Sequence, residues 1–308
     1  MFGPVILAAA RSGGMRRLVS SAPVTRPVVD RFVAGESVAA VLPAVKEMTG
    51  QGLDVTLDVL GEDVTSPAEA TRARDAYLRL VDALGPLGLK TRAEMSVKLS
   101  SFGQALPGGH DIALGHATDV AEAAEAIGTV LTLDMEDHTT TDSTLAVHTS
   151  LRERFPGTGA VVQSYLFRTE DDCRDLARSG ARVRLVKGAY REPADVAYQE
   201  RADVDRAYIR CLRILMEGDG TPMVGTHDPR LISIAQELAR RAGRTPDQYE
   251  FQMLYGIRSD EHRRLAAAGH RMRVYTAFGT DWYGYFMRRL AERPANLAFF
   301  LRSLTGRG

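Results

Sequence analysis

The stretch PMVGTHDPRLISIAQELARRAGRTPDQYEFQMLYG, residues 222–256, contains one complete strand–helix–strand unit. Its two ends, 222–228 and 249–256, are short runs typical of strands, and they finish in turn-forming residues. Between them, residues 228–243 have helical periodicity, with Asp228 and Pro229 suited to the helix start and Gly243 to its end. The unit predicts two parallel strands joined by a crossover helix.

The same alternation extends through most of the chain. The strand-like runs are 53–62, 94–103, 129–136, 160–167, 182–190, 222–228, 249–256 and 271–279. Helical patterns lie between them, including 66–85, which opens with Ser66 and Pro67, and 194–218. Eight alternations without a break in composition predict one (β/α)8 barrel, an α/β fold. An open doubly wound sheet is the structural alternative, but no glycine-rich dinucleotide turn follows the first strand.

Residues 28–49 indicate one or two helices ahead of the barrel, so we expect a helical arm over 1–49 and a catalytic barrel over 50–308. The apolar run at 5–10 is too short for a secretion signal, and basic residues follow it instead of preceding it. We expect this segment to form a short amphipathic helix. It either packs on the barrel or touches a membrane surface, and the sequence leaves both open.

Charge and cysteine content narrow the function. The 308 residues include 39 Lys+Arg and 39 Asp+Glu, and this zero net charge argues against nucleic-acid binding. The two cysteines, Cys173 and Cys211, match no metal-site spacing and suggest reduced thiols in a reducing compartment. We therefore expect a cytoplasmic protein.

Polar residues occur in or just after the strand-like runs, where a barrel of this kind places its chemistry. They include Lys98, Asp134, Gln163, Arg184, Lys187, Thr226, His227, Gln252 and Tyr275. Burying such groups without partners costs about 1–3 kcal/mol each, so their recurrence predicts an enzymatic site.

The charges of this set favour an anionic ligand. Five fixed cations, Lys98, Arg184, Lys187, Arg288 and Arg289, face few obvious catalytic carboxylates, and guanidinium groups suit a carboxylate or a phosphate. Metal chemistry is not expected, because no HxH or HExxH spacing occurs. A Schiff-base lysine of the aldolase type remains an alternative, as does a barrel used only for binding.

Eight motifs carry a family resemblance: VKLS (97–100), LDMED (133–137), VVQSYL (161–166), RLVKGAY (184–190), GTHD (225–228), QMLYG (252–256), RVYTAFG (273–279) and YFMRRLAE (285–292). In this order they resemble the FAD-dependent proline dehydrogenases of the monofunctional bacterial type, over about residues 50–305. The last motif is the most specific. By itself it would also fit a solvated helix face on which Arg288 pairs with Glu292.

The resemblance implies a distorted barrel whose last helix lies over the barrel mouth. It implies oxidation of L-proline to Δ1-pyrroline-5-carboxylate by hydride transfer to FAD, the first step of proline catabolism to glutamate. Electrons would pass to a quinone, with possible peripheral contact at the inner face of the cell membrane, and a separate pyrroline-5-carboxylate dehydrogenase would act next.

The resemblance also assigns residues. Asp134 and Arg184 match catalytic positions, and Asp134 is expected to hold Lys98 or an arginine in place. The substrate positions are Lys98, Tyr190, Leu254, Tyr275, Tyr285, Arg288 and Arg289, of which Lys98 and the two arginines match carboxylate ligands. The cofactor positions are Met135, Gln163, Arg184, Val186, Lys187, Gly188, Ala189, Thr226 and His227. Trp282 is interpreted as a packing residue at a helix start, with a gate over the substrate as the alternative.

Overall fold

The computed structural model describes residues 26–61 and 63–292, and its centre is a closed barrel of eight parallel strands. The strands are β1 (Asp54–Val59), β2 (Ala93–Lys98), β3 (Leu131–Asp134), β4 (Gly159–Gln163), β5 (Arg182–Val186), β6 (Thr221–Gly225), β7 (Glu250–Leu254) and β8 (Arg271–Phe278). Each strand pairs with its neighbours in sequence, and β8 pairs with β1. The predicted (β/α)8 barrel is confirmed, and the open sheet is excluded.

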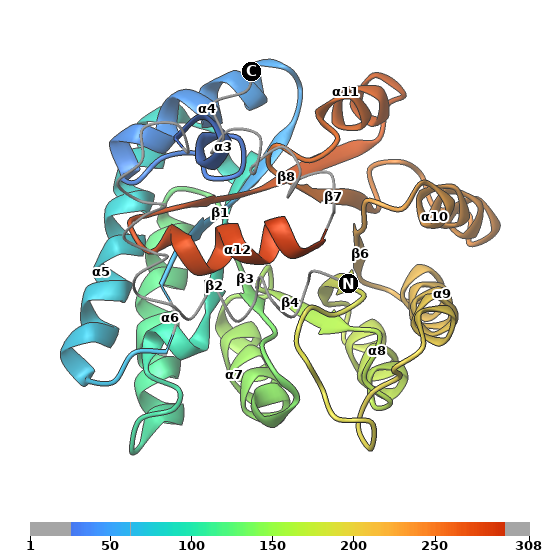
Figure 1. Ribbon diagram of the computed structural model, residues 1–308, viewed down its shortest axis with the longest axis horizontal. Helices are drawn as coiled ribbons and strands as arrows, with labels where there is room; N and C mark the ends of the chain where they lie inside the picture. The colour runs from blue at the N-terminus through green and yellow to red at the C-terminus, as the bar shows by residue number, and fades with distance from the viewer. Residues whose placement is uncertain (1–25, 62, 293–308) are drawn as a thin grey trace.

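The helices alternate with the strands (Figure 1). They are α3 (Arg26–Asp30), α4 (Val38–Gly50), α5 (Pro67–Leu84), α6 (Gly109–Ala126), α7 (Thr141–Arg154), α8 (Thr169–Arg178), α9 (Arg201–Glu217), α10 (Pro229–Arg241), α11 (Ser259–Ala267) and α12 (Trp282–Glu292). Short 3-10 helices are η2 (Gly85–Leu87), η3 (Lys90–Arg92), η4 (Leu99–Phe102) and η5 (His138–Thr140). Within the described residues, no helix is both long and apolar enough to cross a membrane.

Local signals placed several helix ends correctly. The Ser66 side chain caps α5, and the Asp228 side chain caps α10. The helix expected over 194–218 was wrong at its start, because α9 begins at Arg201. Ala197 instead forms an isolated bridge with Leu166, and long-range pairing holds this segment in a non-helical form.

The last helix leaves the barrel wall. Figure 1 shows α5 to α11 around the strands, whereas α12 lies across the barrel opening. The outer position beside β1 is taken by α4, which buries Val41 and Val45 against the barrel and contacts both β1 and α5. Because α4 fills this position, α12 can cover the mouth, as expected for the distorted barrel.

Aromatic packing fixes α12 there. Trp282 and Phe286 are buried with ring centroids 5.9 Å apart, in one apolar cluster with Leu60 after β1 and Ala277 of β8. The Trp282 indole N–H donates to Glu36 Oε1 at 3.1 Å. These contacts support the packing interpretation of Trp282.

Along the strands, polar side chains face the barrel interior and apolar side chains face the surrounding helices. Apolar residues such as Val183 and Leu185 belong to the large core cluster, whereas Arg184 between them hydrogen-bonds across the barrel interior. The interior is therefore charged and hydrogen-bonded, and the apolar core lies between the strands and the surrounding helices. The short N-terminal helix expected around residues 5–10, with its two alternatives of packing on the barrel or touching a membrane, lies outside the described part of the chain, as does the side chain of Glu292.

Candidate active site

Asp134, at the end of β3, is the centre of a buried cluster at the barrel mouth. Its Oδ1 accepts from Arg184 Nη1 at 2.6 Å and from Ser96 Oγ at 2.8 Å. Its Oδ2 accepts from the Tyr275 hydroxyl at 2.7 Å, and Lys98 Nζ lies 3.7 Å away. Four strands thus bring four predicted site residues together, and Asp134, which was expected to hold Lys98 or an arginine, contacts Lys98 and Arg184.

Lys98 has a second carboxylate partner that the sequence did not indicate. Its Nζ donates to Asp58 Oδ2 at 2.8 Å, and the Asp58 side chain is buried at the end of β1. Burial, followed by the nearby charge of Asp134, raises the pKa of Asp58, although Lys98 opposes the rise. The Lys98 amine therefore lies beside two carboxylates, those of Asp58 and Asp134.

Tyr275 joins the two sides of this cluster. Its ring lies over the Arg184 guanidinium, with 5.2 Å between the guanidinium carbon and the ring centroid. Burial raises the pKa of Tyr275 well above its usual value, and the charges of Asp134 and Asp58 add to this effect. The hydroxyl therefore stays protonated and donates to Asp134 at every physiological pH.

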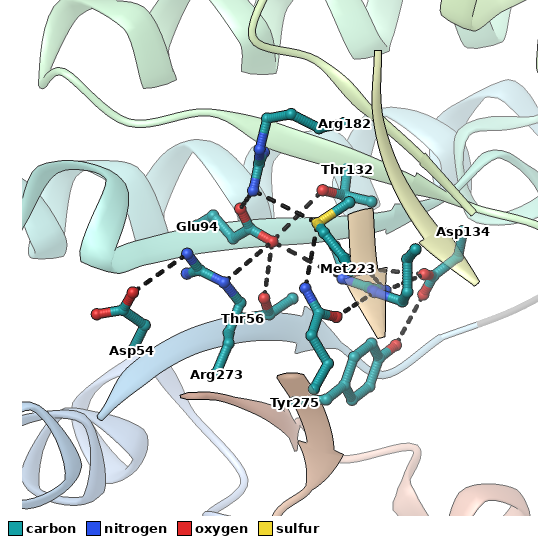
Figure 2. Close-up of polar contacts among 12 residues, drawn as sticks. Asp54, Thr56, Glu94, Thr132, Asp134, Arg182, Met223, Arg273 and Tyr275 are labelled. Atoms are coloured by element: carbon teal, nitrogen blue, oxygen red, sulfur yellow. Dashed lines mark hydrogen bonds and ion pairs between the residues drawn. The ribbon is translucent and has the colours of Figure 1, made fainter. Parts of the chain in front are cut away.

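A second charged layer lies deeper in the barrel (Figure 2). Glu94 accepts from Arg182 Nη2 at 2.6 Å and from Thr56 Oγ1 at 2.8 Å, and Arg273 Nε lies 3.8 Å away. Burial would raise the pKa of Glu94, but the neighbouring charges of Arg182 and Arg273 outweigh it and lower that pKa. Glu94 Oε1 also lies 3.8 Å from Arg184 Nη2, so the deeper layer adjoins the mouth cluster.

The helix over the mouth, α12, carries three of the seven predicted substrate residues, Tyr285, Arg288 and Arg289. Tyr285 and Arg289 are buried, and the Arg289 guanidinium lies 4.9 Å from the centroid of the Tyr285 ring. Leu254 and Tyr275 pack against the same apolar cluster. Arg288 is half-buried. The solvated-face interpretation is therefore wrong for Arg289, whose side chain packs toward the protein.

A polar rim occupies the ends of β4, β5 and β6. Gln163 donates to the Glu136 carbonyl at 2.6 Å, and its Oε1 accepts from the backbone N–H of Ala189 at 3.4 Å. Gly188 has a φ of +122°, and a Cβ there would meet the Tyr165 ring at 2.4 Å. The backbone at Gly188 therefore packs directly against the Tyr165 ring, and only glycine fits at position 188.

The other predicted cofactor positions lie at or just after the ends of β3, β5 and β6. Met135 and Thr226 are buried, and Val186 ends β5 beside Gln163. His227 Nε2 accepts from the Leu254 backbone N–H at 3.0 Å, so this ring links the ends of β6 and β7.

Two predicted residues lie apart from the Asp134 cluster. Lys187 Nζ pairs with Asp205 of α9 and lies 3.6 Å from Asp228 at the start of α10. Tyr190 is 37% exposed, on the loop after β5. The Lys187 amine therefore contacts carboxylates near the starts of α9 and α10, and Tyr190 presents an aromatic side chain to solvent on the loop after β5.

Sequence reasoning gave no role to Asp58, Glu94 or Ser96, and none to Gln252 beyond its polarity. A signal for them exists in the period-two alternation of polar residues in DVTLDV, AEMSVK, RVRLV and EFQML. In a closed barrel, alternate residues point inward, so this pattern marks the polar interior. Within residues 26–61 and 63–292, no group of three or more His, Cys, Asp or Glu residues could hold a metal ion.

Known proteins resemble this chain over most of its length. A family model described as proline dehydrogenase matches residues 41–302. Proline dehydrogenase of Deinococcus radiodurans is 41% identical over 280 residues, covering 90% of both chains. Proline dehydrogenase 1 of Bacillus subtilis is 36% identical over 280 residues, covering 91% of both.

A solved structure has the same fold. Proline utilization A from Bdellovibrio bacteriovorus, inactivated by N-propargylglycine, superposes with a TM-score of 0.79 and 26% identity. The match covers 86% of this chain and 32% of that one, so this chain spans about a third of the larger protein.

Proposed function

The chain belongs to the proline dehydrogenase family, and from this we propose that it oxidises L-proline to Δ1-pyrroline-5-carboxylate with FAD as its cofactor. It is an oxidoreductase of the first step of proline catabolism. The observation that carries the finer proposal is the buried Asp134–Arg184–Lys98 cluster beneath α12, the helix of Arg288 and Arg289.

The charges suit a small amino acid whose carboxylate is the anchor. Lys98, Arg288 and Arg289 would bind that carboxylate, and guanidinium groups do so in a bidentate manner. Tyr275, Tyr285 and the other apolar groups of the mouth would exclude water and fix the ring. Asp134 keeps Arg184 and Lys98 in place by the contacts described above.

The rim residues fit a flavin by the chemistry of their groups. The side chains of Lys187 and His227 suit the polar, anionic part of a dinucleotide, and buried Met135 suits its apolar ring, with Gly188 and Ala189 between β5 and the Tyr190 loop. Gln163, Val186 and Thr226 would complete this set. FAD, when bound, accepts the hydride that leaves the proline ring. Arg184 would place positive charge near it.

The carboxylate contacts of Lys98 and Lys187 disfavour the aldolase alternative. A Schiff-base lysine must be neutral to attack a carbonyl group, whereas Lys98 contacts Asp58 and Asp134. Lys187 likewise pairs with Asp205. In both cases a carboxylate, and not a carbonyl group, occupies the position beside the amine.

We further propose a cytoplasmic enzyme that transfers electrons to a quinone through peripheral contact with the membrane. The two buried free cysteines, Cys173 and Cys211, support a reducing compartment. The next enzyme, a pyrroline-5-carboxylate dehydrogenase, would be a separate chain. In support, the relatives aligned over about nine tenths of both lengths are named proline dehydrogenase alone.

Anaerobic addition of L-proline to the purified holoprotein tests the proposal. The protein should show flavin absorbance, and proline should bleach it with formation of one equivalent of Δ1-pyrroline-5-carboxylate. A colourless protein, or a flavin that proline does not reduce, would contradict it. Retention of a carbonyl substrate after borohydride treatment would favour the aldolase alternative.

A further inference from the structure

The Arg184 guanidinium is held from two directions. Toward the mouth, Nη1 donates to Asp134 and to Ser96. Toward the interior, Nε donates to Gln252 Oε1 at 2.5 Å. Gln252 is buried in β7, and its Nε2 donates in turn to Glu250 Oε1 at 2.5 Å. One amide thus bridges Arg184 and a carboxylate below it.

The chemistry of the two partners requires an amide at this position. Arg184 can only donate hydrogen bonds, so it needs an acceptor. Burial would raise the pKa of Glu250, but Arg273 outweighs it and lowers that pKa to about 2, so Glu250 is an ionised acceptor and needs a donor. Glutamine supplies an acceptor and a donor at this length, whereas a carboxylate or an apolar side chain supplies only one or neither.

The lower end of this chain of bonds is fixed to the barrel. Arg273 Nε donates to Glu250 Oε1 at 2.8 Å, and its Nη2 donates to Glu250 Oε2 at 3.1 Å. Arg273 Nη1 also donates to the carbonyl oxygens of Val55 and Thr91, at 3.0 and 3.1 Å. Glu250 and Arg273 are completely buried, so they form a rigid base for Gln252.

We propose that Gln252 is a positioning residue that fixes the height and orientation of the Arg184 guanidinium by connecting it to the Glu250–Arg273 pair. Gln252 acts through Arg184, so this proposal rests on the function proposed for Arg184. Gln252 thereby links the Glu250–Arg273 pair in the barrel interior to the Asp134 cluster. Loss of the bridge should therefore reduce turnover more than proline binding.

Two variants and one control test this role in the flavin-loaded enzyme. Gln252→Met removes, at similar side-chain length, the hydrogen bonds to Arg184 and Glu250 and a weaker one to Met223 Sδ at 3.2 Å. Gln252→Glu keeps the acceptor for Arg184. The control is Thr129→Val, which removes a buried hydrogen bond to the Ala93 carbonyl oxygen, at the start of β2. The kcat per bound flavin and the KM for proline are measured from about pH 6 to 9, and the crystal structure of each variant is determined.

For Gln252→Met we expect kcat to fall about tenfold at every pH, the effect of one lost hydrogen bond to a charged group, with KM changed less than about twofold. Gln252→Glu places a second carboxylate beside Glu250, and the pair can keep its hydrogen bond only by sharing a proton. Its kcat relative to wild type should therefore fall as pH rises. Thr129→Val should keep the wild-type kcat.

The crystal structure gives a readout independent of activity. In Gln252→Met the Arg184 guanidinium should rotate or shift relative to Asp134, from which it is 2.6 Å in the present structure. An unmoved guanidinium, or wild-type kcat in both Gln252 variants, would overturn the proposal. If Gln252→Met does not fold, Gln252→Glu, which exchanges one amide nitrogen for oxygen, decides by its pH profile. A wild-type protein that proline does not reduce contradicts the proposed function, while the guanidinium position still tests Gln252.

Discussion

The hydroxyl of Tyr275 offers a single-atom test of the Asp134 cluster. Tyr275→Phe removes the donor to Asp134 Oδ2 at 2.7 Å but keeps the ring over Arg184. A hydrogen bond to a charged group contributes about 1.5–3 kcal/mol. Lys98 Nζ lies 3.7 Å from the same oxygen and would compensate in part, so we expect the lower end of this range.

A loss of about 1.5 kcal/mol corresponds to roughly a tenfold fall in kcat/KM. At about 2 °C per kcal/mol for a chain of this size, it also corresponds to a fall in Tm of about 3 °C. Because the pKa of Tyr275 is raised, the hydroxyl keeps its proton above the pH at which tyrosine usually loses it. The ratio of wild-type to variant activity should therefore be flat from about pH 6 to 9.

The assay follows proline-dependent reduction of an artificial dye at varied proline concentration, together with thermal unfolding of the flavin-loaded protein. Tyr249→Phe is the matched control, since its hydroxyl contacts His270 Nδ1 at 3.3 Å, near the starts of β7 and β8. This control should lose a little stability and no activity. Unchanged kcat/KM and Tm in Tyr275→Phe would refute the reasoning that Asp134 depends on this donor.

Three further predictions concern other parts of the molecule. Gly188→Ala should lose bound flavin, because the φ of +122° and the Tyr165 ring leave no room for a Cβ. The control Gly180→Ala, with a φ of +68° and open space, should keep its flavin, as measured by the ratio of flavin to protein absorbance. Burial lowers the pKa of His148 from 6.5 to about 4, so the folded state binds this proton less readily than the unfolded state. The free energy of unfolding should therefore fall by about 3 kcal/mol as the pH drops from about 6.5 to about 4, and His148→Gln should flatten this part of the plot of that free energy against pH. Lys98→Met should weaken proline binding and lower Tm by leaving the Asp58 carboxylate buried without its cation, and adding Asp58→Asn should restore Tm but not the KM for proline.

The sequence predicted the barrel because its signals are local. Strand-like runs alternated with helical patterns, and caps such as Ser66 and Asp228 formed where the sequence placed them. Polar residues in the strand-like runs also predicted a shared site, because parallel strands in a barrel bring their ends together, and the structure places Asp134 and Arg184 in contact there.

Local signals failed where distant segments compete with them. The start of α9 lies at Arg201 because Ala197 pairs with Leu166, and no helix propensity contains that information. The path of α12 likewise depends on α4, which occupies the outer position beside β1.

The sequence by itself therefore determined the fold class and which residue types gather at the strand ends. Only the tertiary structure decided which partners they have. Lys98 contacts Asp58 at a separation of 40 residues and Tyr275 at a separation of 177. Gln252 reaches Arg184 across 68 residues. Propensity and periodicity act over a few residues, whereas these contacts depend on strand register and barrel closure, which bring inward-facing side chains of separate strands to hydrogen-bond distance.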